Sequence, residues 1–374
     1  MAIRAAFFIC GIINNLVYAI FLSAAQRILE SNSNIPVSVV LAANIVPSSL
    51  VSIFAPYFIH RIPYSGLGEL TFLMMTSYYE SSSVSAWSSG TGGSGLLGSF
   101  LFLAFTVWAR LSLTITLCIV AALPPVMLVV YFFYLPSEGI YGGSEGVDGA
   151  RAVGGLLPIQ KEKYTPSSPA ESELGESALR ADKWPVREAA TLRERVQLVK
   201  LLIVPYVLPL FVVYWAQYLT NSGITPTILF NLNKTPFQKM TDHYIYYQAL
   251  YQAGVFISRS SVSILHIQRV WIPSSMQVLT MLLLLSQALF GWMPSVYLVF
   301  AVIFWEGLLG GSTYVNTYFN VSKDVPSTHR EFSMGVCGVG GSMGITIAAF
   351  VGMALEMGLC KFQVSQGNML CKQH

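Results

Sequence analysis

The chain has 374 residues, of which 54% are hydrophobic and only 10% are charged, and its formal net charge is +3. Soluble domains carry about 25% charged residues, so lipid must cover much of the surface of this chain. The small and scattered positive charge excludes a basic nucleic-acid-binding surface, and no nucleic-acid partner is expected.

Apolar runs long enough to cross a membrane occur along most of the chain. A helix that crosses a hydrocarbon core of ~30 Å needs about 20 mostly apolar residues. The first apolar run, residues 5–25, is longer than the apolar core of a secretory signal peptide, so we expect it to be retained as a membrane span. A run at 66–79 is too short to span unaided. The chain is therefore predicted to be an all-α, polytopic transmembrane helical bundle, with full spans at residues 5–25, 37–59, 86–108, 111–134, 198–221, 243–265, 270–291, 294–320 and 332–357.

A polar segment, residues 135–197, interrupts these runs. It is rich in Gly, Ser, Pro and charge and cannot bury enough apolar surface to fold alone, so it is predicted to be a disordered loop. Lys and Arg residues next to the following span place the loop in the cytosol. Residues 1–134 then form an N-terminal bundle of four full spans plus the half-length segment, and residues 198–374 form a C-terminal bundle of five spans with a short tail. A long cytosolic loop between two sets of helices is typical of a two-halved transporter.

Two glycosylation sequons occur after the loop. Asn233-Lys234-Thr235 follows it by one span, which places Asn233 on the lumenal or extracellular side, where it can be glycosylated. Asn320-Val321-Ser322 comes three spans later and falls on the cytosolic side. We therefore expect only Asn233 to be modified.

Three charged residues stand out within the apolar runs: Glu69, Arg259 and Glu306. A charge in mid-membrane costs about 2.5–3.5 kcal/mol on insertion scales, so each needs a structural or functional reason. Two interpretations stay open for Arg259 and Glu306: a polar face toward a wet cavity, or a buried pair in which Arg259 neutralises a glutamate. For Glu69, near a helix end, the structural interpretation is favoured.

Helical spacing gives these charges polar neighbours. Gln248, Gln252 and Arg259 share one face of a helix, and Thr313 falls on the same face as Glu306. Tyrosines crowd the start of the span at 243–265. They are predicted to form an interfacial belt, with the alternative that Tyr247 and Tyr251 line a pocket beside the glutamines.

Small residues recur at spacings of three and four in two stretches, 88–99 and 306–312. This pattern lets membrane helices approach closely. It predicts close helix packing at Gly92, Gly95, Gly98, Gly307 and Gly311.

Two common signatures of enzymes are missing from the sequence: it has no P-loop and no HExxH motif. Its five histidines do not cluster with carboxylates at metal-ligand spacing. We expect neither catalysis nor a cofactor or metal, and a solute or proton gradient would drive any transport.

Several stretches together closely resemble the battenin family of lysosomal membrane proteins, and the resemblance runs from about residue 5 to 360. It implies a fold related to the major facilitator superfamily and residence in lysosomal and late endosomal membranes. It also implies a part in lysosomal pH and in the clearance of glycerophosphodiesters, with basic amino acids as the alternative substrate. The stretches are SGLGELTFL (65–73), WSSGTGGSGLLG (87–98), YQAGVFISRSS (251–261), PSVYLVF (294–300), EGLLGGSTYVNT (306–317) and HREF (329–332).

The chain departs from the family pattern in three places, and it retains a dileucine pair in the loop. Between Ser65 and Gly66 it lacks roughly one and a half helices, so the N-terminal half is incomplete and residues 66–79 must dip into the membrane or lie along its surface. Gln217 stands where the family more often has glutamate. The C-terminal Cys371 is not followed by aliphatic residues, so prenylation is not expected. Leu156-Leu157 resembles a dileucine sorting signal whose acidic residues lie further upstream than usual.

The resemblance and the residues together predict a lysosomal exporter that works by alternating access. Arg259 would hold an anionic or zwitterionic phosphodiester, because guanidinium suits bidentate recognition of oxyanions. Glu306 and Glu69 would balance Arg259 in the empty site or carry protons, and Gln248, Gln252 and Thr313 would bond substrate hydroxyls. The alternative is a non-transporting membrane organiser that recruits trafficking proteins through the loop at 135–197.

Overall fold

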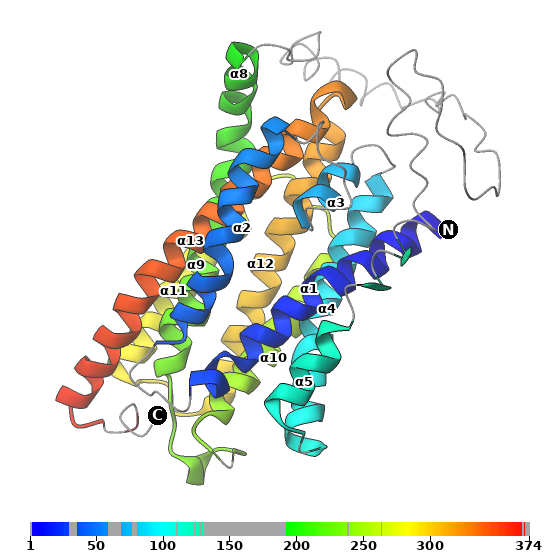
Figure 1. Cartoon of the computed structure of the whole chain (residues 1–374). Coiled ribbons are helices and arrows are strands. Elements are labelled where there is room, and N and C mark those ends of the chain that lie inside the picture. The colour runs from blue at the N-terminus through cyan, green and yellow to red at the C-terminus, as the bar shows by residue number, and fades with distance from the viewer. Residues whose placement is uncertain are drawn as a thin grey trace.

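A computed structural model of the chain is helical in every regular element that it describes (Figure 1), which confirms the all-α prediction. It describes residues 2–29, 36–58, 69–76, 81–109, 111–122, 125–126, 129–130, 192–237, 239–262, 264–368 and 370. The elements are α1 (Ala2–Leu29), α2 (Ser38–Phe58), α3 (Glu69–Met75), α4 (Ser81–Leu103), η4 (Ala104–Trp108), α5 (Leu113–Ala121), α8 (Leu192–Leu202), η6 (Ile203–Val207), α9 (Leu208–Leu219), η7 (Thr220–Ile224), η8 (Thr225–Thr227), η9 (Leu232–Lys234), α10 (Asp242–Ser260), α11 (Trp271–Phe290), α12 (Val296–Asp324) and α13 (Ser327–Ser365).

Within the described residues, five helical stretches are long and apolar enough to cross a membrane, so the chain is a multi-pass membrane protein. The helices α4 and α10 also match predicted spans, and their 23 and 19 residues are long enough at 1.5 Å per residue, but they carry more polar side chains. Only part of the predicted span at 111–134 is described. The full set of nine spans stays a prediction. The five stretches are Ile3–Leu22, Glu194–Thr227, Trp271–Phe290, Val296–Asp324 and Ser327–Ser365.

Polar and apolar side chains are distributed as lipid requires. The side chains of Gln217, Asn221 and Gln277 are buried inside the bundle, whereas Leu279 is 65% and Phe350 is 56% exposed on its outer surface. Water favours the opposite arrangement in a soluble protein. In a bilayer, polar groups face the bundle interior because hydrocarbon offers them no hydrogen bonds.

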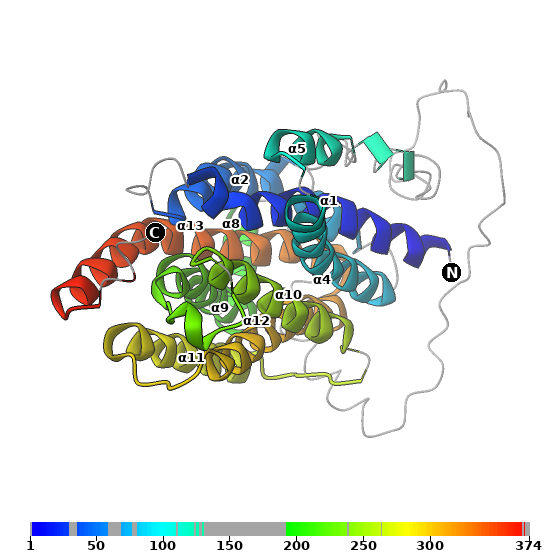
Figure 2. The ribbon, with the colours of Figure 1, turned by 90° about the horizontal axis from the view of Figure 1, so that it is seen from below.

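Helices from the two ends of the chain pack along two seams (Figures 1 and 2). The helix α1 lies along α4, and α4 packs against α10 and α12. The helix α2 instead packs against α13. The N-terminal helices thus meet the C-terminal ones mainly through the α4–α10 and α2–α13 seams, and α9 packs against α13 and α11 (Figure 2).

The half-length segment at 66–79 contains the short helix α3, which packs against α13 and α1. Residues 72–76 are buried, and the ring of Phe72 stacks on that of Trp87 with centroids 5.2 Å apart. A helix of 7 residues is only about 10 Å long and cannot cross the membrane. This part of the segment is covered by neighbouring helices, and its depth in the membrane stays a prediction.

The helix α8 begins at Leu192, so the last six residues of the predicted loop, 192–197, are helical and not disordered. Glu194 in its first turn and Lys200 in its last suit the helix dipole. Residues 135–191 lie outside the described residues. Beyond α8 the helix widens into the π-turn η6 around Pro205, and a second π-turn, η7, follows α9.

Candidate functional site

Glu306 on α12 lies at the centre of a buried polar network. Its side chain is 0% exposed, and its Oε1 accepts hydrogen bonds from Asn221 Nδ2 at 3.1 Å and from Gln277 Nε2 at 3.2 Å. Gln248 Nε2 donates to Asn221 Oδ1 at 3.2 Å. We call these four residues the amide cage. It joins η7, α10, α11 and α12 within the C-terminal set of helices.

The π-turn η7 aims Asn221 at the carboxylate. The Asn221 Nδ2 also donates to the Gln217 carbonyl at 3.0 Å, which holds its side chain against the helix it comes from. The side chain of Gln217 fills the space beside Gly310, one turn after Glu306. A Cβ at Gly310 would lie 2.5 Å from Gln217 Oε1. Glycine at this position therefore allows α9 to reach α12 beside the cage.

Arg259 on α10 forms a second cluster, at the seam between the two sets of helices. Its Nη1 donates to Thr91 Oγ1 of α4 at 2.7 Å, and its Nη2 donates to the Tyr214 hydroxyl of α9 at 3.4 Å. The guanidinium carbon lies 3.9 Å from the centre of the Tyr314 ring, a cation–π contact. We call Arg259, Thr91, Tyr214 and Tyr314 the seam cluster. The Arg259 side chain is only partly buried.

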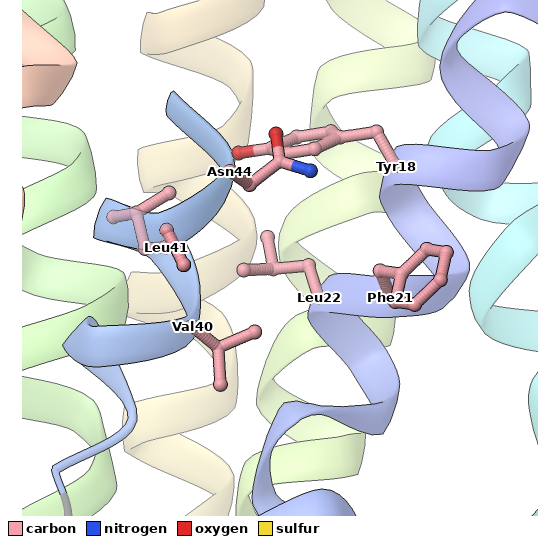
Figure 3. Close-up of a pocket in the computed structure, with 7 residues that line it drawn as sticks. Tyr18, Phe21, Leu22, Val40, Leu41 and Asn44 are labelled. Carbon is pink, nitrogen blue, oxygen red and sulfur yellow. The ribbon is translucent and has the colours of Figure 1, made fainter. Parts of the chain in front are cut away.

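A chain of tyrosines connects the seam cluster to a pocket. The rings of Tyr214 and Tyr218 stack with centroids 5.9 Å apart, and the Tyr218 hydroxyl accepts a hydrogen bond from the Tyr18 hydroxyl at 3.3 Å. Tyr18 lines a pocket of about 230 Å³ between α1 and α2 (Figure 3). The other lining residues are Phe21, Leu22, Val40, Leu41, Ala43 and Asn44.

Arg259 and Glu306 do not pair, so the interpretation in which Arg259 neutralises Glu306 is wrong. The hydrogen-bond partners of Glu306 are neutral amides. Arg259 stacks on Tyr314, which lies eight residues beyond Glu306 on α12, or about 12 Å along the helix axis.

The predicted polar face of α10 divides between two neighbours. Gln248 points into the amide cage. Gln252 lies against α4, because a Cβ added at Gly95 would collide with its side-chain amide. The hydroxyl of Thr313 donates to the Leu309 carbonyl of its own helix at 3.0 Å. The polar side chains predicted to share a face therefore do not form one continuous lining of a cavity.

Most of the tyrosines at the start of α10 are buried, so the interfacial-belt prediction is wrong for Tyr244, Tyr247 and Tyr251. Only Tyr246 is exposed, at 42%. Tyr247 donates to the Ile228 carbonyl at 3.0 Å and thereby ties α10 to the end of η8. Burial of these rings among neighbouring helices replaces the expected contact with lipid head groups.

The predicted packing glycines all lie at helix contacts. An added Cβ would meet Phe256 and Arg259 at Gly92, Gln252 at Gly95, and Ala19 at Gly98. On α12, Gly307 faces Tyr251 and Gly254, and Gly311 faces Ser258 and Val255.

The remaining predicted sites divide between exposed, buried and undescribed positions. Asn233 is exposed in η9, in the connection between α9 and α10. Asn320 is buried and donates to the Ile267 carbonyl at 3.1 Å, so it is not available for glycosylation. The side chain of Glu69 and the pair Leu156-Leu157 lie outside the described residues.

Sequence analysis missed Asn221 and Gln277, because it searched the spans for charges and for neighbours of charges on the same helix. Both are neutral and come from other helices. A signal was present: Gln277 is an amide within an otherwise apolar turn of α11, and Asn221 follows Gln217 by four residues.

Comparison with known proteins gives consistent matches over the whole chain. The family model described as "CLN3 protein" matches residues 5–65 and 64–362. Protein btn-1 of Neurospora crassa is 39% identical over an alignment that covers 100% of this chain and 91% of the relative. Protein BTN1 of Chaetomium globosum is 38% identical over 98% and 90%, and Protein BTN1 of Yarrowia lipolytica is 36% identical over 99% and 97%. The two matched stretches of the family model meet at Ser65, where the sequence was predicted to lack helices.

Proposed function

Because the chain belongs to the CLN3 protein family, also called battenin, we propose that it is a transporter of the lysosomal or vacuolar membrane that exports glycerophosphodiesters. In this proposal the N-terminal and C-terminal helices rock against each other along the α4–α10 and α2–α13 seams, as in alternating access. The overall arrangement would correspond to a major-facilitator fold with an incomplete N-terminal half.

The observation that carries the proposal is the placement of Arg259. It bonds α4 through Thr91 and α9 through Tyr214, so its cation lies where the two sets of helices meet. A substrate between the helices would meet the guanidinium together with the hydroxyls of those two residues. Guanidinium and hydroxyl donors suit the two free oxygens of a phosphodiester. A free basic amino acid would instead bring its own cation against Arg259, which disfavours that alternative substrate.

The charge distribution supports a cytosolic position for the loop-facing helix ends. Among the residues that the structure describes, cationic residues at the loop-facing helix ends outnumber those at the opposite ends, as expected if the loop-facing ends lie in the cytosol. At the loop-facing ends are Arg4, Arg193, Arg195, Lys200, Arg269, Lys323 and Arg330; at the opposite ends are Arg27, Lys234, Lys239 and Lys361.

Uptake of radiolabelled glycerophosphocholine into proteoliposomes tests the proposal. Arg259→Ala should lower uptake at least tenfold, because a lost hydrogen bond to a charged group costs about 1.5–3 kcal/mol. Arg259→Lys should retain part of the activity. Arg269→Ala is the matched control, since Arg269 is exposed in the connection between α10 and α11.

Two results would overturn the proposal. Uptake of glycerophosphocholine that is the same in Arg259→Ala as in the parent would remove Arg259 from the binding site. Uptake of labelled lysine without uptake of glycerophosphocholine would assign the chain a different substrate.

A further inference from the structure

Two buried oxygens of the amide cage accept no hydrogen bond from any described residue: Glu306 Oε2 and Gln277 Oε1. Both side chains are 0% exposed. The two groups already share one hydrogen bond, from Gln277 Nε2 to Glu306 Oε1 at 3.2 Å. Each buried acceptor left without a donor costs about 1–3 kcal/mol, so a missing donor at this place needs an explanation.

No described cationic side chain supplies that donor. Asn221 of η7 and Gln277 of α11 are neutral amides, and each donates to the other oxygen, Oε1. From α10, Tyr251 is the titratable side chain nearest to consider, and it is buried. The Arg259 guanidinium lies over Tyr314, about two turns along α12 from the carboxylate. The carboxyl group of Glu306 therefore lies among neutral hydrogen-bonding groups.

A single proton satisfies both oxygens. A carboxylic acid and a primary amide pair through two parallel hydrogen bonds, one N–H to O and one O–H to O, because the two oxygens of the acid and the O and N of the amide lie at matching separations. The first of these bonds is present here. The second needs a hydrogen on Glu306 Oε2, directed at Gln277 Oε1.

We propose that Glu306 and Gln277 form a proton-binding site, in which Glu306 binds one proton on Oε2 and donates it to Gln277 Oε1. The proton arrives from water and returns to water, and no covalent bond other than O–H forms or breaks. Release of the proton leaves two acceptors facing each other between α11 and α12. It thereby weakens the contact between these helices. Asn221 in η7 then donates to a charged carboxylate in place of a neutral acid.

The site stands on these contacts alone, whereas its use in transport rests on the proposed function. A proton bound in the cage would be the ion whose gradient drives the helices between their two positions. Glu306 would then act as a coupling residue that does not touch the substrate, since Arg259 at the seam cluster provides the substrate contact.

Infrared difference spectroscopy of the reconstituted full chain tests the site without requiring transport. Spectra are recorded while the buffer is changed between acidic and alkaline. The proposal expects a carbonyl stretch of a protonated carboxylic acid that is lost in Glu306→Gln. In Gln277→Leu the band should move to higher frequency, because the acid loses its acceptor. Gln287→Leu is the matched control on the same helix and should leave the band in place.

Three outcomes would overturn the proposal: no acid band that disappears in Glu306→Gln, a band that is the same in Gln277→Leu as in the parent, or an acid band removed by sodium ions at constant pH, which would make the cage a metal site. If Gln277→Leu does not fold, the spectrum of Glu306→Gln and the sodium titration still show whether Glu306 binds a proton. Uptake of glycerophosphocholine by the parent is measured separately, so failure of the proton site and failure of the proposed substrate give different results.

Discussion

Asn316 and Asn320, one turn apart on α12, hold the connection between α10 and α11. Asn316 Oδ1 accepts from the Ile267 backbone at 2.7 Å, and Asn320 bonds the His266 ring at 2.6 Å and the Ile267 carbonyl at 3.1 Å. Side-chain amides supply both donors and acceptors, so a single asparagine satisfies several backbone groups of an irregular segment. Two neutral amide side chains thus hold the backbone of this connection in place without a charged group.

Asn320→Ala should lower the free energy of unfolding by about 1–3 kcal/mol, because it removes two hydrogen bonds, from the Asn320 side chain to the Ile267 and Gln268 carbonyls, at about 0.5–1.5 kcal/mol each. Thermal unfolding in detergent measures the effect. Asn233→Ala, at an exposed position, is the control and should leave the melting temperature unchanged. Equal melting temperatures for Asn320→Ala and the parent would show that the connection does not depend on this asparagine.

The ring of Tyr314 should matter more than its hydroxyl for the position of Arg259. Tyr314→Phe keeps the cation–π contact, whereas Tyr314→Leu removes it at a cost of about 0.5–2 kcal/mol. We expect the KM for glycerophosphocholine to rise several-fold in the leucine variant and to change little in the phenylalanine variant. If both variants behave alike, the ring contact does not position the cation.

At the scale of elements, the contact between α10 and α12 depends on glycine. Gly254 and Gly307 face each other, and Cβ atoms at either position would collide with the backbone of the opposing helix. This close approach brings Gln248 on α10 within reach of Asn221 and so completes the amide cage. The packing of these two helices and the chemistry of the cage are therefore linked.

Gly307→Ala should destabilise the protein strongly, since the new Cβ would meet the Tyr251 carbonyl. Gly358→Ala, in α13, has open space around the added Cβ and should stabilise by up to about 1 kcal/mol through helix propensity. Gly307→Ala is expected to lower the melting temperature and Gly358→Ala to raise it. A Gly307→Ala protein as stable as the parent would contradict the packing described here.

At the scale of the whole molecule, the two sets of helices are joined at both ends of the bundle. At the loop-facing end Ser89 of α4 and Ser260 of α10 lie with their hydroxyl oxygens 2.7 Å apart. At the opposite end Glu356 of α13 accepts from the backbone of Val37 at 3.3 Å, just before α2 begins, and Ser38 donates to the Ser222 carbonyl at 2.7 Å. Alternating access requires these two sets of contacts to open in turn.

Cysteines at Ser89 and Ser260 should form a disulfide that locks the loop-facing end, because the two side chains already meet. Oxidation of the Ser89→Cys/Ser260→Cys double variant should abolish uptake of glycerophosphocholine, and reduction should restore it. Each single variant is the control for reaction at other cysteines. Full uptake while the bridge is formed would rule out opening at this end.

Glycosylation tests the orientation of the molecule. Asn233 is exposed and follows the far end of the helical stretch that begins with α8, so removal of N-glycans should increase gel mobility in the parent and not in Asn233→Gln. Asn320→Gln should behave like the parent, because Asn320 is buried. A glycan that persists in Asn233→Gln would contradict the proposed orientation.

From the sequence alone came the membrane class, the helical architecture, the family and the residues most in need of explanation, Arg259 and Glu306. Hydrophobic run length and the cost of a charge in lipid are local properties, so they can be read without knowing which helices meet. What only the tertiary structure decided is that these charges stand apart, Arg259 at the seam and Glu306 among amides. Their partners Thr91, Asn221 and Gln277 come from other helices, and hydrogen bonds between helices depend on packing that no periodicity within one helix encodes.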